Sequence, residues 1–219
     1  MLDTETTGLD PAEGHRIVEI AALELLNHVP TGRVFHAYVN PERAMPSEAE
    51  AIHGLSDAFL AKEKTFAAIV DAFLAFIGAD RLVIHNAEFD QRFINAELKR
   101  LQRAPLASPV TDTLALARSR FPGAPASLDA LCRRFEIDLT ARTKHGARLD
   151  CELLAQVYLE LIGGRQPGLE LAHAARPTEA GAVTIDRPAR PPRPHAPTAE
   201  EMAAHEVLIA KLTDTLWRH

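Results

Sequence analysis

The chain has 219 residues, of which 47% are hydrophobic, enough for one full core with an appendage or for two small domains. No stretch approaches the apolar length of a membrane span, and the first residues lack the regions of a secretory signal, so we expect a cytoplasmic protein with no membrane contact. The net charge of −6 lies within residues 1–163, which excludes a broad basic surface for nucleic acid there.

Strand and helix signals alternate through the first 164 residues. A first strand should end near Glu5, beside an antiparallel pair at 16–25 and 33–39, where β-branched and aromatic residues are frequent. The other expected elements are a helix at 66–77, a buried strand at 82–84, a helix at 88–102, a strand end at 109–112, and helices at 113–120, 127–136 and 147–162. Meandering strands followed by strands that alternate with helices predict an α/β domain, with a mixed sheet flanked by helices.

The composition changes at Gly164. Residues 165–197 are rich in proline and poor in large apolar side chains, which predicts a flexible linker without a core. Thr198 and Glu201 then have the spacing of a capping box and predict a helix within residues 198–219. Its apolar stripe consists of Ala204, Leu208, Leu212 and Leu216, with Trp217 beside it. We therefore expect a domain at 1–164, a linker and a C-terminal helix.

Two carboxylates lie close together near the start of the chain. Side chains at positions i and i+2 of a strand share a face, so Asp3 and Glu5 should project together. Two like charges so close are costly unless a cation lies between them. A solvated strand end is the alternative for this pair taken alone. The following residues, Thr6 to Leu9, supply hydroxyls, a flexible glycine and an apolar side chain that suit a nucleotide-binding loop.

Two further acidic residues occur near helix starts. The segment His85–Asp90 follows a buried strand and opens a helix, a place where α/β sheets often carry functional groups. Asp90 taken alone is more simply explained as an acid that complements the helix dipole. Asp150 falls on or beside the apolar face of the 147–162 helix, with His145 on the loop before it. An unpaired buried carboxylate is expensive, so we expect Asp150 to have a partner.

Together the three segments resemble the DEDDh family of 3′→5′ exonucleases. The motifs are D-x-E-T-T-G-L at Asp3–Leu9, H-N-x-x-F-D at His85–Asp90 and H-x-x-x-x-D at His145–Asp150. Within that family, the chain is most similar to the proofreading subunits of bacterial replicative DNA polymerases, through the runs Phe121–Gly123, Ser127–Cys132 and Arg142–Asp150. The resemblance implies a ribonuclease-H-like fold with a mixed five-stranded sheet, and removal of mispaired 3′-terminal nucleotides from DNA.

The resemblance also implies a role for each charged residue. Four carboxylates would hold two divalent cations, Mg²⁺ or Mn²⁺, which prefer oxygen ligands. Asp3 would bridge the cations, Glu5 and Asp150 would complete the site on the nucleophile side, and Asp90 would support the second cation. His145 would take the proton of the attacking water, since histidine side chains titrate near neutral pH.

Five more residues are expected to grip the terminal nucleotide of the substrate. They are Thr6, Leu9, His53, Asn86 and Phe89. For His53 a purely structural role is an equal alternative.

The tail implies protein partners. Gln166, Leu169 and Leu171 resemble the short peptide by which polymerase partners dock on the sliding clamp. The alternative is a linker start whose leucines merely cover the domain. The apolar stripe of the C-terminal helix has no core to join, so we expect it to lie in a groove of the polymerase alpha subunit. A small third subunit of the polymerase core is a further candidate partner.

Two other functions are compatible with the same motifs or with the same tail. One is a free-standing DEDDh exoribonuclease that acts on RNA ends or short oligonucleotides. The other is a non-catalytic module that bridges polymerase and clamp, although a scaffold does not need clustered acids that lower stability.

The start of the chain departs from the family. Relatives have several residues before the first motif, whereas Asp3 is the third residue here. We expect either that the start lies upstream or that a shortened first strand is tolerated at reduced stability.

Overall fold

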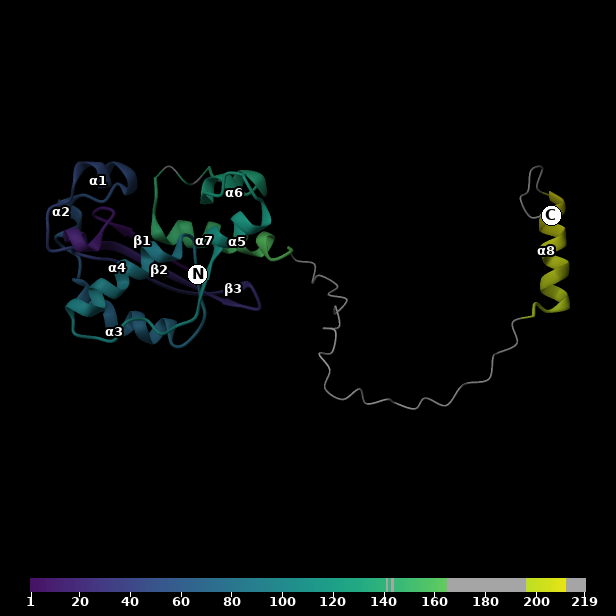
Figure 1. The fold of residues 1–219 in the computed structure, drawn as a ribbon, viewed down its shortest axis with the longest axis horizontal. Helices are drawn as coiled ribbons and strands as arrows, with labels where there is room; N and C mark the ends of the chain where they lie inside the picture. The colour runs from purple at the N-terminus through teal and green to yellow at the C-terminus, as the bar shows by residue number, and fades with distance from the viewer. Residues whose placement is uncertain (141, 143, 165–195, 212–219) are drawn as a thin grey trace. The chain divides into compact units, whose positions relative to one another are not determined.

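The computed structural model describes residues 1–140, 142, 144–164 and 196–211 (Figure 1). The chain divides into two compact units, residues 1–170 and 171–219. The first contains the strands β1 to β5 and the helices η1 and α1 to α7, and the second contains α8. No helix within the described ranges is long and apolar enough to cross a membrane.

Strands of both orientations form the centre of the first unit, as the sequence predicts. β1 (Leu2–Thr6), β2 (Ile17–Leu26) and β3 (Val29–Tyr38) are antiparallel and pair in that order, while β4 (Leu82–Ile84) and β5 (Val110–Asp112) pair in parallel. The expected five-stranded sheet is interrupted, because β1 and β4 lie next to each other without a ladder between them.

The turn between β2 and β3 is tighter than the sequence predicts. The strands run up to Leu26 and on from Val29, which leaves Asn27 and His28 as the loop, both with positive φ (50° and 67°). A two-residue loop of left-handed residues matches the right-handed twist of paired strands. Pro30 fits inside β3 because that strand is at the edge of its sheet, where a missing N–H is tolerated.

The helices begin and end close to the predicted residues. α3 and α5 have the predicted bounds, and α4, α6 and α7 differ from them by at most two residues at either end. The helices are η1 (Pro11–Glu13), α1 (Ser47–His53), α2 (Asp57–Leu60), α3 (Phe66–Ile77), α4 (Ala87–Arg100), α5 (Thr113–Arg120), α6 (Leu128–Arg134) and α7 (Ala147–Leu161).

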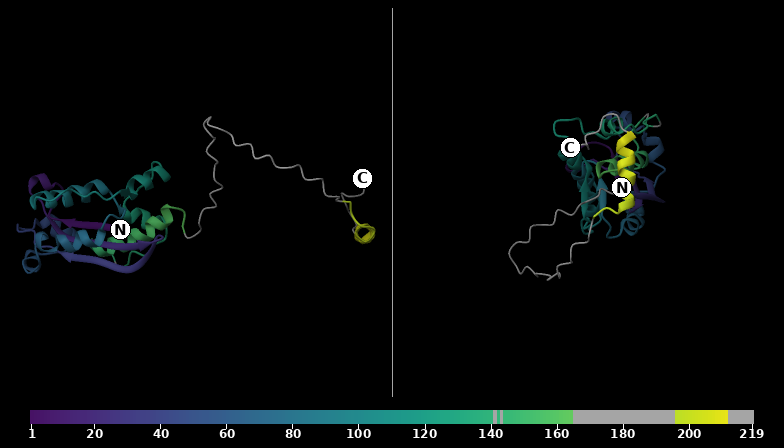
Figure 2. Two further views of the ribbon diagram at one scale, coloured as in Figure 1. Left: turned by 90° about the horizontal axis from the view of Figure 1, so that it is seen from below. Right: turned by 90° about the vertical axis from the view of Figure 1, so that its right-hand side faces the viewer.

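Alternation along the strands gives the sheet two different faces. Ile20 and Ile84 belong to the apolar cluster formed with α3 and α4. Ala21 and Val83, each one residue away, pack instead against α7. α5 and α6 then pack on the far side of α7. The helices therefore lie along both faces of the strands, as the first unit in Figure 2 shows.

A buried ion pair joins the loop after β1 to α4. Arg16 Nε and Nη2 donate to the two carboxylate oxygens of Glu97 at 2.6 and 2.9 Å, and Glu97 is 3% exposed. The backbone N–H of Arg16 donates to Thr7 Oγ1, and the backbone N–H of Thr7 donates to the carbonyl of Arg16. Two parallel, charge-assisted bonds fix orientation as well as distance, so this pair holds the loop that follows β1 in place.

The second unit contains α8 (Ala199–Lys211), and the predicted capping box at its start is confirmed. Glu201 Oε2 accepts from Thr198 N at 2.8 Å, and Thr198 Oγ1 accepts from Glu201 N at 3.2 Å. No residue of α8 is buried. The other tail residues predicted to bind partners lie outside the described residues: Gln166, Leu169, Leu171, Leu212, Leu216 and Trp217.

Candidate active site

One cleft of about 740 Å³ in the first unit is lined by every catalytic and nucleotide-binding residue that the sequence predicts. These are Asp3, Glu5, Thr6, Leu9, His53, Asn86, Phe89, Asp90, His145 and Asp150. A larger hollow of about 880 Å³ lies between η1 and α4 and is lined by none of them. The gathering of titratable groups, rather than size, therefore identifies the candidate site.

The two acids of β1 project toward α7. Asp3 is paired across the strands with Ala21, which packs against α7, and Glu5 is paired with Glu19. Glu5 is 9% exposed and Glu19 is 4% exposed. Glu19 was not among the predicted site residues, because it lies in a run of apolar strand residues. β1 and β2 thus bring three carboxylates to one face.

Asp90 enters the cleft from the first turn of α4 and is 2% exposed. Thr4 lies between the two acids of β1 and therefore points to the opposite face of that strand. Its hydroxyl donates to Asp90 Oδ1 at 2.7 Å. The middle residue of the Asp-x-Glu motif thus orients the acid of α4, which the sequence analysis did not anticipate.

Asp150 has the partner that its burial requires, as predicted. Arg142 donates through Nε and Nη2 to its two carboxylate oxygens at 2.6 and 2.7 Å. The same guanidinium also donates to Asp129 and, at 2.9 Å, to His145 Nδ1. Arg142 therefore joins the acid and the histidine of the third motif, a role that the sequence did not reveal.

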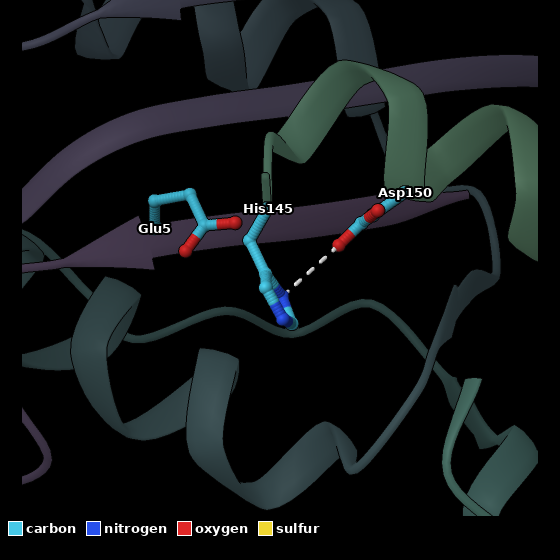
Figure 3. Close-up of side chains that lie close together, drawn as sticks. All are labelled: Glu5, His145 and Asp150. Carbon is cyan, nitrogen blue, oxygen red and sulfur yellow. Dashed lines mark ion pairs between the residues drawn. The ribbon is translucent and has the colours of Figure 1, made fainter. Parts of the chain in front are cut away.

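Glu5, His145 and Asp150 form a compact group (Figure 3). One ligand atom from each lies within 4.8 Å of the others, and His145 Nδ1 is 3.6 Å from Asp150 Oδ2. Among the described residues, this is the group whose composition and spacing suit a metal ion. Asp3 and Asp90 line the same cleft. An oxygen-rich set of this kind suits hard divalent cations.

Burial raises the pKa values of three of the acids, and at two of them neighbouring acids add to the rise. Burial, reinforced by the nearby Asp90 and Glu5, raises the pKa of Asp3 well above its usual range. Burial, with Asp150 and Glu19 close by, raises the pKa of Glu5 to about 8. Burial also raises the pKa of Asp90 to about 7, against the hydrogen bond from Thr4. Bound cations would favour the charged forms of all three.

The loop after β1 depends on a close approach at Gly8. A Cβ atom at this position would lie 2.3 Å from the ring of His15, so a larger residue would displace that ring. The Thr6 hydroxyl donates to the carbonyl of Gly8 at 2.6 Å. Leu9 projects from the loop and is 79% exposed, while Arg92 donates to its carbonyl at 3.0 Å. Hydrogen bonds from Thr6 and Arg92 therefore hold the loop, while the side chain of Leu9 is exposed to solvent.

Two further residues of the cleft have unusual local environments. His53 is buried, accepts from Leu55 N through Nδ1 at 3.0 Å, and has no hydrogen-bond partner for Nε2 within the described part of the chain. Asn86 precedes α4 in the left-handed region (φ 64°), and its N–H donates to Asp112 Oδ1 at 3.1 Å. A buried polar atom without a partner and a left-handed non-glycine residue are both frequent at binding sites.

Comparison with protein families and solved structures identifies the family and the fold of this chain. The exonuclease family (RNase_T) matches residues 1–158. Exonuclease X in complex with 5′ overhanging duplex DNA is 27% identical, with a TM-score of 0.58 over 74% of this chain and 89% of that one. The nuclease domain of 3′hExo, a DEDDh family member bound to rAMP, is 17% identical with a TM-score of 0.63 over the same shares, and it shows the fold. Fold and site together define a 3′→5′ exonuclease of the DEDDh type.

Curated relatives narrow the family further. The DNA polymerase III subunit epsilon of Rickettsia felis is 47% identical over 98% of this chain and 96% of its own length. The subunit of the same name from Escherichia coli K12 is 43% identical over 100% of this chain and 96% of its own length. The chain belongs to the exonuclease family, in the branch of the DNA polymerase III epsilon subunits.

The raised pKa of Glu5 makes stability depend on pH. Its carboxyl has a pKa of about 8 in the folded chain against an ordinary value of 4.5, so the folded state holds more protons between these values. Without divalent cations, the free energy of unfolding should therefore fall as pH rises through this window. Glu5→Gln, which cannot ionise, should show a shallower fall and exceed wild type at pH 8 in denaturant titrations.

Glu24→Gln is the matched control, because Glu24 lies on β2 in an ion pair with Arg33 away from the cleft. It should follow the wild-type pH dependence. Equal slopes for wild type and Glu5→Gln would contradict the repulsion between the acids.

Proposed function

We propose that this chain proofreads newly made DNA as the exonuclease subunit of the replicative polymerase, releasing mispaired 3′-terminal nucleotides as monophosphates with the aid of two divalent cations, Mg²⁺ or Mn²⁺. The observation that carries the proposal is the meeting of four carboxylates from β1, α4 and α7 with one histidine in a single cleft. Membership of the epsilon-subunit branch supplies the context of replication. We expect the protein to act in the bacterial cytoplasm, at the replication fork.

The carboxylates fit cations better than any other cofactor. Burial raises the pKa values of Asp3, Glu5 and Asp90, and neighbouring acids raise those of Asp3 and Glu5 further, so a nearby positive charge would favour the ionised forms. In the proposed arrangement Asp3, Glu5 and Asp150 would hold one cation, and Asp3 and Asp90 would hold the other. When bound, such ions activate water and stabilise charge on the attacking and leaving oxygens of a phosphodiester.

His145 is proposed to accept the proton of the attacking water. Its side chain is 50% exposed at the edge of the cleft, so it is in contact with solvent. Nδ1 accepts a hydrogen bond from Arg142, which leaves the ring proton of the neutral form on Nε2. Acting as a base through either ring nitrogen therefore requires this contact to open, because an Nδ1 that carries the ring proton cannot accept from Arg142.

The remaining cleft residues are proposed to bind the terminal nucleotide. Leu9 is exposed and held by its carbonyl, so it can pack against a base. His53 Nε2 is buried and unpaired within the described residues, so it can bond a polar atom of the sugar or phosphate. Thr6, Asn86 and Phe89 line the same cleft. None of these contacts distinguishes ribose from deoxyribose, so substrate preference must be measured directly.

Digestion of primer–templates tests the proposed function. Wild type with Mg²⁺ or Mn²⁺ should remove mispaired 3′ ends faster than paired ones, and an RNA oligonucleotide digested in parallel measures the preference between deoxyribose and ribose. Asp3→Ala should abolish hydrolysis without lowering the melting temperature, since it removes a repelling acid. Asp71→Ala changes an exposed surface acid and should leave the rate unchanged. Wild-type rates in Asp3→Ala would overturn the assignment of the cations to these acids.

Removal of the proposed general base, His145, should slow cleavage without a matching loss of cation affinity. His145→Ala should slow single-turnover cleavage by ~10²–10⁴-fold, with the affinity for Mn²⁺ largely kept because carboxylates supply most ligands. His28→Ala, at the exposed hairpin tip, is the control. Full single-turnover rates in His145→Ala would reduce this residue to a packing role.

The tail is proposed to hold the exonuclease on its partners. Leu208 of the predicted stripe is 56% exposed on α8, and Val207 beside it is 57% exposed. An isolated helix of this length is marginal in water, so it gains stability by laying an apolar face in a groove. We assign α8 to the polymerase alpha subunit and residues 166–171 to the sliding clamp, and a small third core subunit is a further candidate partner.

Truncation separates catalysis from docking. A chain that ends at Gly164 should keep its nuclease activity on single strands, because the residues lining the cleft all precede that point. It should lose co-elution with the polymerase alpha subunit in gel filtration. Leu208→Asp in the full chain should weaken co-elution without changing nuclease activity. If the truncated chain still co-elutes, the contact lies on the catalytic unit.

A further inference from the structure

Glu19 is a buried acid that the proposed catalytic scheme does not use. It is 4% exposed on β2 and lies directly across the strands from Glu5. Its charge adds to the repulsion that raises the pKa values of Asp3 and Glu5. Burying one more carboxylate beside the others is costly unless its oxygens have strong partners. Those partners indicate what the residue does.

Each carboxylate oxygen of Glu19 has its own partner. Oε2 accepts from the backbone N–H of Ala147 at 3.2 Å, a buried bond between residues 128 positions apart. Oε1 is 2.7 Å from His36 Nε2, on the neighbouring strand β3. The histidine therefore fixes one oxygen, and the other is directed at the first residue of α7.

The start of α7 needs an acceptor from elsewhere in the chain. Its N-cap residue is Gly146, which has no side chain to bond the first turn. The first N–H groups of a helix have no partner within the helix, and a negative charge at this end is favourable. Glu19 supplies both the acceptor and the charge.

We infer that Glu19 is a positioning residue, which caps α7 from β2 and thereby fixes His145 and Asp150 opposite Glu5. His145 lies two residues before the capped Ala147, and Asp150 lies three residues after it. Because Glu19 is also the cross-strand partner of Glu5, the register of one strand pair places the acid of β1 and the helix start together. This inference rests on the proposed roles of His145 and Asp150.

Losing the cap should loosen the first turn and not the helix as a whole. Cys151 and Leu154 remain packed against the sheet, and Cys151 Sγ donates to Ala21 O at 3.4 Å. The chain would therefore stay folded while His145 and Asp150 gain freedom. A misplacement of about 1 Å at a reacting group can cost ~10²-fold in rate.

The test compares Glu19→Ala with Glu19→Gln in the full chain. Gln keeps an oxygen for Ala147 N–H and offers its amide to His36, so it should restore kcat on a mispaired primer to within a few-fold of wild type. Ala cannot cap, and its kcat should fall by ~10–100-fold with KM nearly unchanged. Glu24→Ala, on the same strand outside the cleft, should behave as wild type.

Two outcomes would overturn the inference. If Glu19→Gln is as inactive as Glu19→Ala and both lose Mn²⁺ affinity equally, Glu19 is a cation ligand. If Glu19→Ala lowers the melting temperature but not kcat, Glu19 serves folding alone.

Amide exchange measured by NMR separates this inference from the proposed function. Protection of the Ala147 N–H should fall in Glu19→Ala and persist in Glu19→Gln, whatever the activity. An inactive wild type with that exchange pattern would reject the proposed function and keep the cap. Unchanged Ala147 protection in Glu19→Ala would reject the cap.

Discussion

Repulsion between carboxylates that share one buried cleft is the constraint on which the rest of this structure depends. Two unit charges 4 Å apart repel by ~4 kcal/mol near a protein surface, and Asp3 and Glu5 each have more than one acidic neighbour that raises the pKa of the carboxyl. Acids on flexible segments would relieve this by moving into solvent. Here a strand and the first turns of two helices hold them in place, so the repulsion persists and favours any divalent cation that enters. Arg142 forms an ion pair with Asp150, and its charge also opposes the rise in the pKa of Glu5, but neither acid of β1 has an ion pair of its own among the described residues.

The acids are held in place because side chains alternate between the two faces of β1. Leu2 packs into the apolar cluster under α3 and α4, whereas Asp3, on the other face, is directed toward α7. Thr4 returns to the α4 side and bonds Asp90. A shift of one residue in the pairing of β1 with β2 would exchange these faces and separate the acids. The two apolar clusters that stabilise the fold therefore also fix the register on which the site depends, and a core substitution that loosens either cluster would affect catalysis as well as stability.

The sequence predicted the parts of the site that depend on local periodicity. The shared face of Asp3 and Glu5, the helix over 66–77 and the burial of Asp150 with a partner all follow from spacings of two or of three to four residues. It could not predict contacts that only tertiary pairing creates. In the sequence, Glu19 is a charged residue within an apolar strand and has no evident role. Its role becomes visible only in the folded chain, where the N–H of Ala147 donates to it. Arg142 lies in an irregular segment without periodicity, and whether β1 and β4 form a ladder depends on their spacing in the folded chain.

An acidic catalytic unit has a consequence for how mispaired ends are selected. Little counterion release is available to drive binding, so the cleft gains few contacts with duplex DNA beyond the terminal nucleotides it accepts. If the cleft accepts only a melted end, each base-pair step that must open costs ~1.4 kcal/mol, which lowers the accessible fraction about tenfold. A mispaired end has already lost most of that stabilisation. Weak intrinsic binding then becomes an advantage, because tighter binding would help the nuclease to melt correct ends as well. A tether restores the encounter rate through effective concentration without adding contacts that favour either end. The acidity of residues 1–163 and the separate C-terminal helix are, in this account, two parts of one solution to selectivity.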